Sequence, residues 1–314
     1  MEKPIRSLHH VTATVSDAQE DLDFYTGLLG QRLVKKTVNF DNTHVYHFYY
    51  GDETGSPGTI MTTFPYGQMG VRQGTHGAGQ ITTTSFSAPA GSLPFWYERL
   101  SYAGVPFEAE SSGFGENVVR FKDPSGLTIR IVESPADART PWRKADIGDA
   151  NALRGIHGVS LTVRDPKQTL AFMNDFMDTT VVGEREGALR VAVNGDAPGR
   201  LVEIIRGDKA PNAVNGLGTV HHVAFAVDDP DQQLELRKEL VRRGVPVTEV
   251  MDRQYFKSIY FREPGGVLFE VATIPPGFTA DESIADLGTS LKLPPWEEDN
   301  RRNIEAGLPV VRAS

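Results

Sequence analysis

FREPGGVLFE, at residues 261–270, is the stretch that decides the fold, because it has a counterpart in FKDPSGLTIR at 121–130. Both stretches read as a strand, a tight turn built around Pro and Gly, and a second strand. The segments before them, KELVRRGVPVTEV (238–250) and ERLSYAGVPFEAE (98–110), lie at the same offset. Each of these ends a helix, passes through Gly-Val-Pro and enters a strand. Similarity at one constant offset over such lengths indicates an internal duplication.

A second pair of segments extends the duplication. LHHVTATV (8–15) and IHGVSLTV (156–163) both read as strands with alternating apolar residues. They are followed by residues 16–34 and 164–182. Each of these begins near an Asp that could cap a helix, continues with apolar residues at helical spacing and ends in a β-branched strand. The sequence therefore predicts four βαβββ modules, close to residues 7–65, 77–134, 154–206 and 218–273.

The predicted fold class is α+β, with the four modules forming two cupped, barrel-like halves. The stretch 135–153 is polar and contains Pro, as expected of a linker. We therefore predict one domain over 1–145 with modules one and two, a second over 150–275 with modules three and four, and a C-terminal tail over 276–314. Within the tail, the charged segment EEDNRRNIEAG (297–307) is predicted to form one short surface helix.

The composition excludes several classes of function. Of the 314 residues, 39% are hydrophobic and 23% charged, which is the ordinary range for a globular protein with a sizeable core. The net charge of −9 argues against nucleic-acid phosphates and anionic membranes as partners, because both attract basic surfaces. Neither a signal peptide nor an apolar run of roughly 18 residues, the length of a membrane span, is visible. We expect a cytoplasmic homo-oligomer.

The absence of cysteine limits the chemistry further. Thiolate nucleophiles, zinc–thiolate sites and iron–sulfur clusters are excluded, so any metal must be held by His, Asp, Glu or water. The repeat allows one inward position on the first strand and one on the last strand of each module to be compared. The first-strand positions are His10, Gln80, Gly158 and His222. The last-strand positions are Thr62, Arg130, Glu203 and Glu270.

Modules one and four alone place a His on the first strand, and module four also ends on a carboxylate. Two imidazoles and one carboxylate with open positions are the arrangement by which non-haem Fe(II) oxygenases bind a substrate and O2 together. A lone strand His is more often a core residue than a ligand. Glu270, however, lies in the apolar strand GGVLFEVA and requires a partner, because an unpaired buried carboxylate costs several kcal/mol. We therefore predict His10, His222 and Glu270 as metal ligands.

This ligand set also predicts how the modules pair. Modules one and four must face each other, which leaves modules two and three to form the second cup. No metal is expected in the second cup, where Arg130 and Glu203 should approach each other because each would otherwise be a costly buried charge. Thr62 matters in the first cup, since a Glu at that position would close the site toward a four-ligand metal.

Three motifs within the modules resemble the vicinal oxygen chelate superfamily, namely LHHVT (8–12), HHVAFAV (221–227) and GGVLFE (265–270). Within that superfamily, the chain is more similar to the hydroquinone-type ring-cleaving dioxygenases than to glyoxalase I. The closer match is carried by DFYTGLLGQRLVKKTVNFD (23–41), YHFYYGDETGSPGTIMTTFP (46–65) and the tail GFTADES…LGTSLKLP (277–294). The resemblance covers nearly the whole chain.

The resemblance implies an enzyme that cleaves the ring of a hydroquinone or related dihydroxybenzene with O2, at one Fe(II) that Mn(II) sometimes replaces. A para-hydroquinone with chloro or alkyl substituents is the expected substrate. The metal ligands implied are His10, His222 and Glu270. The implied residues near the substrate are His9, His221, Tyr260 and Arg253 as catalytic groups and Thr12 as a substrate-binding group.

Some of these positions have a second interpretation. Adjacent strand residues point to opposite faces, so His9 and His221 should face away from the metal unless the strand is bulged or twisted. Otherwise they would bond to the backbone or fill the neighbouring layer. Arg253 could equally be a solvated loop charge, and the Tyr260 hydroxyl could equally reach a surface water.

Two further features are interpreted as structural. The aromatic run HFYYGDE (47–53) is expected to pack the sheet and to start a turn. His44, His47, His76 and His157 have no carboxylate companion in register and are not predicted to belong to the site. The Gly-rich stretch GQMGVRQGTHGAG (67–79) lacks the context of a phosphate loop, and we interpret it as a flexible connection bordering the mouth of the site.

Two other classes of function remain open. One is a glyoxalase-like metal-dependent lyase or isomerase on the same fold, which would be expected to show a fourth ligand where Thr62 stands. The other is a small-molecule binding protein, which would have no need for three ligands in register.

Overall fold

The computed structural model describes residues 4–144 and 146–312, and it contains the four predicted modules in order. Module one consists of β1 (Leu8–Val15), α1 (Ala18–Leu22), η1 (Asp23–Leu28), β2 (Arg32–Asn39), β3 (Asn42–Gly51) and β4 (Ile60–Pro65). After η2 (Gly67–Met69), module two consists of β5 (Gln80–Ala88), α2 (Leu93–Tyr102), β6 (Phe107–Ser111), β7 (Asn117–Lys122) and β8 (Thr128–Glu133). Module three consists of β9 (Gly155–Val163), α3 (Pro166–Met177), β10 (Thr179–Arg185), β11 (Ala188–Val193) and β12 (Leu201–Arg206). Module four consists of β13 (Thr219–Val227), α4 (Pro230–Arg242), β14 (Met251–Asp252), β15 (Lys257–Arg262) and β16 (Leu268–Thr273).

Three of the four module helices, α1, α3 and α4, begin at a capping carboxylate that the sequence supplies, whereas the N-cap residue of α2 makes no side-chain cap. Asp17 accepts hydrogen bonds from two backbone N–H groups of α1, and Asp165 accepts one from Lys167 in α3. The first helix is less regular than its pattern predicts, because α1 continues as the π-helix η1. There the Thr26 hydroxyl donates to the Leu22 carbonyl at 2.7 Å, a type of bond that bends helices.

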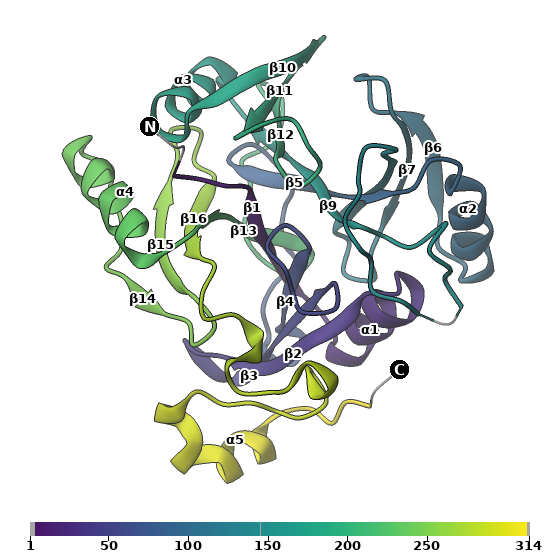
Figure 1. Ribbon diagram of the computed structural model, residues 1–314, viewed down its shortest axis with the longest axis vertical. Helices are drawn as coiled ribbons and strands as arrows, with labels where there is room; N and C mark the ends of the chain where they lie inside the picture. Colours follow the sequence, from purple (N-terminus) through teal and green to yellow (C-terminus); the bar gives the residue numbers. More distant parts are fainter. Residues whose placement is uncertain (1–3, 145, 313–314) are drawn as a thin grey trace.

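Two eight-stranded sheets pair the modules. One sheet has the order β14-β15-β16-β13-β1-β4-β3-β2 and joins module four to module one, and the other has the order β10-β11-β12-β9-β5-β8-β7-β6 and joins module three to module two. Both joins are antiparallel, β1 against β13 and β5 against β9. Figure 1 shows helices α1 to α4 at the periphery and the joined strands inside. The predicted α+β fold and its module pairing are confirmed.

Aromatic contacts tie the two sheets into one apolar core. Phe24 of η1 packs against Phe121 of β7, with ring centroids 6.3 Å apart. Phe172 and Phe176 of α3 pack against Phe261 of β15 at 6.0 and 5.6 Å. Each of these helices therefore covers a strand of the other sheet, and the buried core runs through all four modules. The domain boundaries near 145 and 276 stay predictions. Each sheet takes one module from each predicted domain, so the sheets do not mark where one domain ends and the next begins.

The tail returns to module one. It contains η3 (Phe278–Ala280), η4 (Ile284–Asp286), η5 (Pro295–Asn300) and α5 (Arg301–Gly307), which agrees with the short helix predicted over 297–307. Lys36 of β2 forms a bridge to Leu291, and Figure 1 shows the yellow tail beneath β2 and β3. Within the parts of the chain that the structure describes, no helix has both the length and the apolarity needed to span a bilayer.

The Gly-rich stretch 67–79 is not a free connection, and that prediction is wrong. The Thr75 N–H donates to the Val214 carbonyl at 2.8 Å, and the Gly74 N–H donates to the Leu217 carbonyl at 2.9 Å. The connection between modules one and two is thus paired with the connection between modules three and four. The sequence does not show this pairing, because both stretches lack a strand-like apolar pattern.

Candidate metal centre

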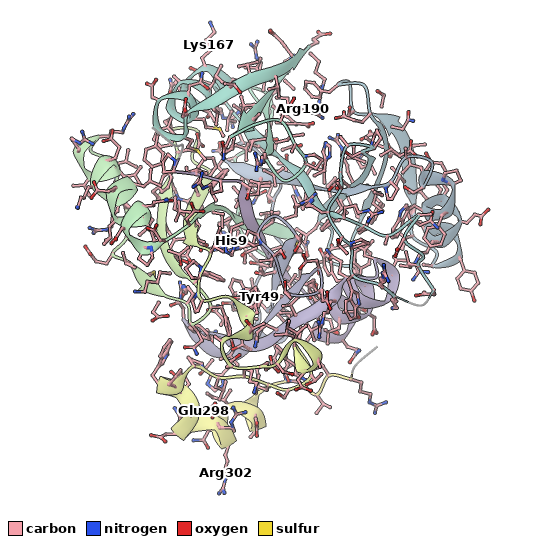
Figure 2. The ribbon with its side chains drawn as sticks, in the orientation of Figure 1. His9, Tyr49, Lys167, Arg190, Glu298 and Arg302 are labelled. Carbon is pink, nitrogen blue, oxygen red and sulfur yellow. The ribbon has the colours of Figure 1, made fainter. Side chains whose placement is uncertain are left out.

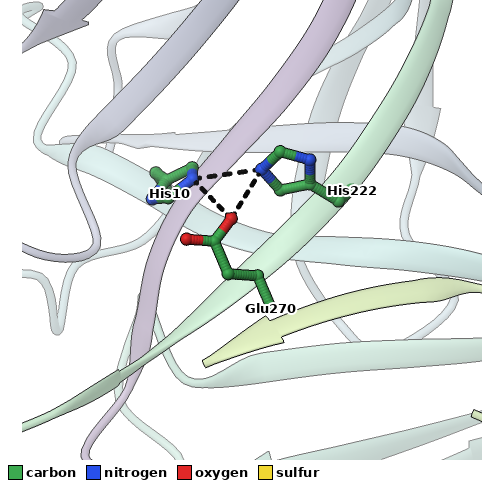
Figure 3. A group of neighbouring side chains, drawn as sticks. All are labelled: His10, His222 and Glu270. Carbon is green, nitrogen blue, oxygen red and sulfur yellow. Dashed lines mark hydrogen bonds and ion pairs between the residues drawn. The ribbon is translucent and has the colours of Figure 1, made fainter. Parts of the chain in front are cut away.

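Three donor atoms from the joined modules one and four meet within the first sheet (Figure 3). His10 Nε2 lies 3.2 Å from His222 Nε2 and 3.4 Å from Glu270 Oε2, and His222 Nε2 lies 2.8 Å from the same oxygen. The antiparallel join of β1 and β13 brings the two histidines together, and Glu270 follows on β16, which runs parallel to β13. Among the described residues, this is the one group of three or more such side chains that could share an ion.

The surroundings of Glu270 fit a metal cation. Its side chain is fully buried, its Oε1 accepts a hydrogen bond from the Ser258 hydroxyl, and its Oε2 faces the two imidazoles without a regular hydrogen-bond partner. Burial by itself raises the pKa of Glu270, but His10 and His222 more than offset this and hold its pKa well below the usual range. An ionised carboxylate oxygen beside two imidazole nitrogens is the donor set of a site with two His and one carboxylate.

His9 and His221 are the extra residues of two bulges. The pairing of β1 with β13 skips His9 on one strand and His221 on the other, at two register shifts. A bulge releases its extra residue from the strict alternation of strand faces. Each histidine therefore stays beside the predicted ligand that follows it, with Nδ1–Nδ1 distances of 2.9 Å to His10 and 2.7 Å to His222. The strands are thus bulged at His9 and His221, which is the condition under which these two side chains need not face away from the predicted metal.

These contacts are suited to fixing the tautomers of the two predicted ligands, His10 and His222. An imidazole that ligates through Nε2 carries its proton on Nδ1, and that proton can be donated to the neighbouring histidine. Burial, and next the adjacent His10 or His222, lowers the pKa of His9 and of His221 to about 3 each. Both neighbours are therefore neutral and able to accept the proton.

A cavity of about 250 Å³ opens on His10 and His222. Of the residues predicted near the substrate, Thr12, His221, Arg253 and Tyr260 line it. His9 does not belong to this lining, and its ring is buried against Phe256 with centroids 5.1 Å apart. The remaining lining is formed by Thr14, Asn39, Phe40, Asp41, His47, Tyr49, Phe64, Tyr66 and Phe256. Since an apolar cavity of about 150 Å³ is enough to hold benzene, this space suits a single substituted ring.

Arg253 is held in place rather than solvated. Its side chain is 15% exposed, its Nε donates to the Tyr260 hydroxyl at 3.2 Å, and its Nη2 donates to Asp41 Oδ2 at 3.0 Å. The loop that carries it turns at Gln254, which has a φ of 65°, and closes with a bond from the Arg253 N–H to the Phe256 carbonyl. Burial, and next Glu270, raises the pKa of Tyr260, so this hydroxyl stays protonated.

His47 belongs to the cavity, which the sequence interpretation missed. Its Nε2 lies 2.8 Å from Thr62 Oγ1, and its Nδ1 lies 2.9 Å from the Tyr49 hydroxyl. The search for a carboxylate companion in register could not find it, because its partners are hydroxyl groups. A usable signal was present, since His47 and Tyr49 share one face of β3 and that strand pairs with β4.

In the second cup, Gln80 is not the structural equivalent of His222. The pair formed by Thr12 and His222 across the first join corresponds to the pair formed by Ser160 and Thr83 across the second. The position assigned to Gln80 is therefore wrong by three residues, because the first strand of module two has too little sequence similarity to set its register.

The predicted charge pair of the second cup is confirmed. Arg130 Nη1 lies 3.4 Å from Glu203 Oε2, and Arg190 Nη2 lies 2.8 Å from Glu203 Oε1. Glu203 holds the last-strand position of module three, as Glu270 does in module four, but is compensated by two guanidinium groups instead of two imidazoles.

Comparison with known proteins agrees with this fold. The profile of the Glyoxalase/Bleomycin resistance protein/Dioxygenase superfamily matches residues 7–131 and 155–271. MhqE of Bacillus subtilis (strain 168), provisionally named a ring-cleaving dioxygenase, is 45% identical over 304 residues, which cover 97% of this chain and 98% of MhqE. A protein of Sphingobium indicum named chlorohydroquinone/hydroquinone 1,2-dioxygenase is 38% identical, with 94% of this chain and 93% of that protein covered.

Solved structures give the same result. The crystal structure of a provisionally named dioxygenase from Bacillus subtilis subsp. subtilis str. 168 matches with a TM-score of 0.95 and 40% identity, covering 100% of this chain and 99% of that chain. Glyoxalase I from Zea mays matches with a TM-score of 0.63 at 14% identity, which shows a shared fold alone; the match covers 85% of this chain and 92% of that chain. The chain belongs to the Glyoxalase/Bleomycin resistance protein/Dioxygenase superfamily.

Proposed function

We propose that this protein is an Fe(II)-dependent ring-cleaving dioxygenase that acts on a hydroquinone or a related dihydroxybenzene, with Mn(II) as a possible replacement. The observation that carries the proposal is the convergence of His10, His222 and Glu270 beside a cavity sized for one ring. The names of the relatives from Bacillus subtilis and Sphingobium indicum support it.

The absence, in the part of the chain that the structure describes, of a fourth ligand, which would be a second carboxylate, separates this proposal from a glyoxalase-like lyase. Thr62 stands where a fourth ligand would be expected, and its hydroxyl is engaged by His47 and Thr12. The three-ligand set therefore leaves positions open for both the aromatic substrate and O2.

When bound, the metal ion would supply electrophilic activation of the phenol and a path for electrons to O2. The side chains around it would bind and orient the ring. The Arg253 guanidinium and the protonated Tyr260 hydroxyl offer donors, and neutral His221, whose Nδ1 accepts from His222, offers its Nε2–H as a further donor to the substrate. The aromatic walls at Phe64 and Phe256 keep the ring away from water.

The lining favours a hydroquinone over a catechol. A catechol can place both of its oxygens on a metal and orient itself by chelation. A para-hydroquinone can place only one there, so protein hydrogen bonds must orient the rest of the ring. Thr12, His221, Arg253 and Tyr260 provide such groups within one cavity. Both atoms of O2 would enter the product, with the ring as the source of electrons, so no added reductant is required.

The proposal is tested by steady-state O2 consumption of iron-loaded protein with methylhydroquinone, chlorohydroquinone and catechol side by side. We expect faster consumption with the two hydroquinones. A clear preference for catechol would place the protein among catechol-cleaving enzymes, and no turnover of any ring would favour the small-molecule binding protein.

A further inference from the structure

Four side chains form a continuous hydrogen-bonded row along the module-one wall of the cavity. The Tyr49 hydroxyl meets His47 Nδ1 at 2.9 Å, His47 Nε2 meets Thr62 Oγ1 at 2.8 Å, and Thr62 Oγ1 meets Thr12 Oγ1 at 3.0 Å. The strand register produces this row, because Tyr49 is the partner of Thr62 across β3 and β4, and Thr62 is the partner of Thr12 across β4 and β1. Tyr49, Thr62 and Thr12 are buried, and Figure 2 shows Tyr49 near the middle of the molecule.

The geometry gives this row a direction. Thr62 has a single hydroxyl proton, and in the hydrogen bond between the two threonines Thr62 is the donor and Thr12 the acceptor. Thr62 must therefore accept from His47, which requires a proton on Nε2. If His47 is neutral, its Nδ1 then has no proton and accepts from the Tyr49 hydroxyl. The surroundings support the neutral form, since burial, followed by His10 and His222, lowers the pKa of His47 well below its usual value.

The row ends on a hydroxyl proton of Thr12 that has no acceptor among the described residues. Thr12 already accepts from Thr62, and it lines the cavity two residues after His10 on the same strand. Its proton can therefore be donated into the cavity, to an oxygen of a bound ring.

We propose that His47 and Tyr49 are positioning residues, which orient Thr62 so that Thr12 presents a hydrogen-bond donor to an oxygen of the aromatic substrate. This inference rests on the proposed function for the identity of the substrate, but not for the direction of the row. A reversed row, with the proton on Nδ1 of His47, would make Thr12 donate to Thr62 and present a lone pair to the substrate instead.

The direction is tested by ¹⁵N nuclear magnetic resonance of histidine-labelled full-length protein, after chelator treatment so that paramagnetic iron does not broaden the signals. The signal of His47 is assigned by its loss in the His47→Gln variant. We expect the neutral Nε2–H tautomer between about pH 6 and 9, and a shift away from it in Tyr49→Phe. The Nδ1–H tautomer, or a doubly protonated ring, would overturn the proposal. This readout does not depend on turnover, so it stands even where the proposed function fails.

The consequence for the substrate is tested with Thr62→Val and its conservative control Thr62→Ser. Thr62→Val keeps the shape of the side chain but breaks the row, and we expect about tenfold weaker anaerobic binding of methylhydroquinone and about tenfold lower kcat/KM. Thr62→Ser keeps the hydroxyl and should retain wild-type values within about twofold. Equal losses in both variants at unchanged Tm, or no loss in either, would contradict a role for the row in positioning.

Discussion

Lys35 of β2 and Asp281 of the tail form an ion pair in which Nζ lies 2.5 Å from Oδ1, and Lys35 is fully buried. The same ammonium contacts Glu282, and Asp281 also accepts a hydrogen bond from the Tyr255 hydroxyl at 3.0 Å. Tyr255 lies in the short loop that carries Arg253 into the cavity. The tail thus supports the loop that forms one wall of the site.

Removing the Lys35 ammonium group should therefore destabilise the fold. Lys35→Met leaves the buried Glu282 carboxylate and the partly buried Asp281 carboxylate without their cation, and breaking a buried pair in this way costs about 3 kcal/mol. The free energy of unfolding, measured by urea denaturation, should fall by that order. Lys167→Met, at an exposed lysine that Figure 2 places at the edge of the molecule, is the control. Equal stability of the two variants would show that the tail is not anchored through Lys35.

Glu270→Gln should abolish stoichiometric metal retention while the protein stays folded. The amide is neutral and cannot replace the ionised oxygen that faces His10 and His222. The matched control is Glu203→Gln, at the last-strand position of module three in the second cup, which should retain one metal ion per chain. Metal analysis of anaerobically purified protein measures the number of metal ions per chain in both variants. Full iron content in Glu270→Gln would refute the ligand assignment.

Tyr260→Phe should lower kcat/KM for methylhydroquinone by about 100-fold, because it removes one donor placed in the cavity. Metal content and Tm should be unchanged, since the phenyl ring keeps its packing against His222, where the ring centroids lie 5.5 Å apart. Tyr102→Phe, at a tyrosine that is 97% exposed, serves as the control and should behave as wild type. Wild-type kinetics in Tyr260→Phe would show that this hydroxyl has no role in the reaction.

Asp21 should make the stability of the fold decrease with rising pH. Burial raises its pKa from the ordinary 3.8 to about 8, although the Thr63 and Tyr50 hydroxyls donate to it. The folded state therefore binds this proton more tightly than the unfolded chain does, so the contribution is complete below about pH 4 and lost as the pH rises to about 8.

The variant Asp21→Asn has no titrating carboxyl group at this position and so removes the Asp21 contribution to the pH dependence of stability. The unfolding free energy of the wild type minus that of Asp21→Asn should fall between about pH 5 and 9, by up to a few kcal/mol. Urea denaturation across this range measures the difference, and a difference that does not change with pH would mean that Asp21 is already ionised in the folded protein at low pH.

The repeat made the fold and the three converging donors predictable. Because equivalent module positions fall on equivalent strands, His10, His222 and Glu270 could be selected without knowing any distance. The bulges at His9 and His221 could not be, since they depend on the register between β1 and β13, two strands far apart in the sequence.

The position of His47 in the site and the surroundings of Arg253 could not be predicted from the sequence either. His47 is held by two hydroxyl groups, and hydroxyl-bearing residues are too common in strands to mark a site by themselves. The surroundings of Arg253 depend on Asp41, which comes from a different module. Contacts of this kind arise from tertiary packing and leave no periodic pattern in the sequence.

The central claim is most directly tested by mass spectrometry of the product that iron-loaded protein forms from methylhydroquinone under ¹⁸O2. Rapid borohydride reduction traps the product, so that a new aldehyde oxygen does not exchange with water. We predict one ring-opened product that carries both labelled atoms, formed by the wild type and not by Glu270→Gln. Unlabelled quinone as the sole product, or ring opening with equal yield in Glu270→Gln, would contradict a dioxygenase centred on His10, His222 and Glu270.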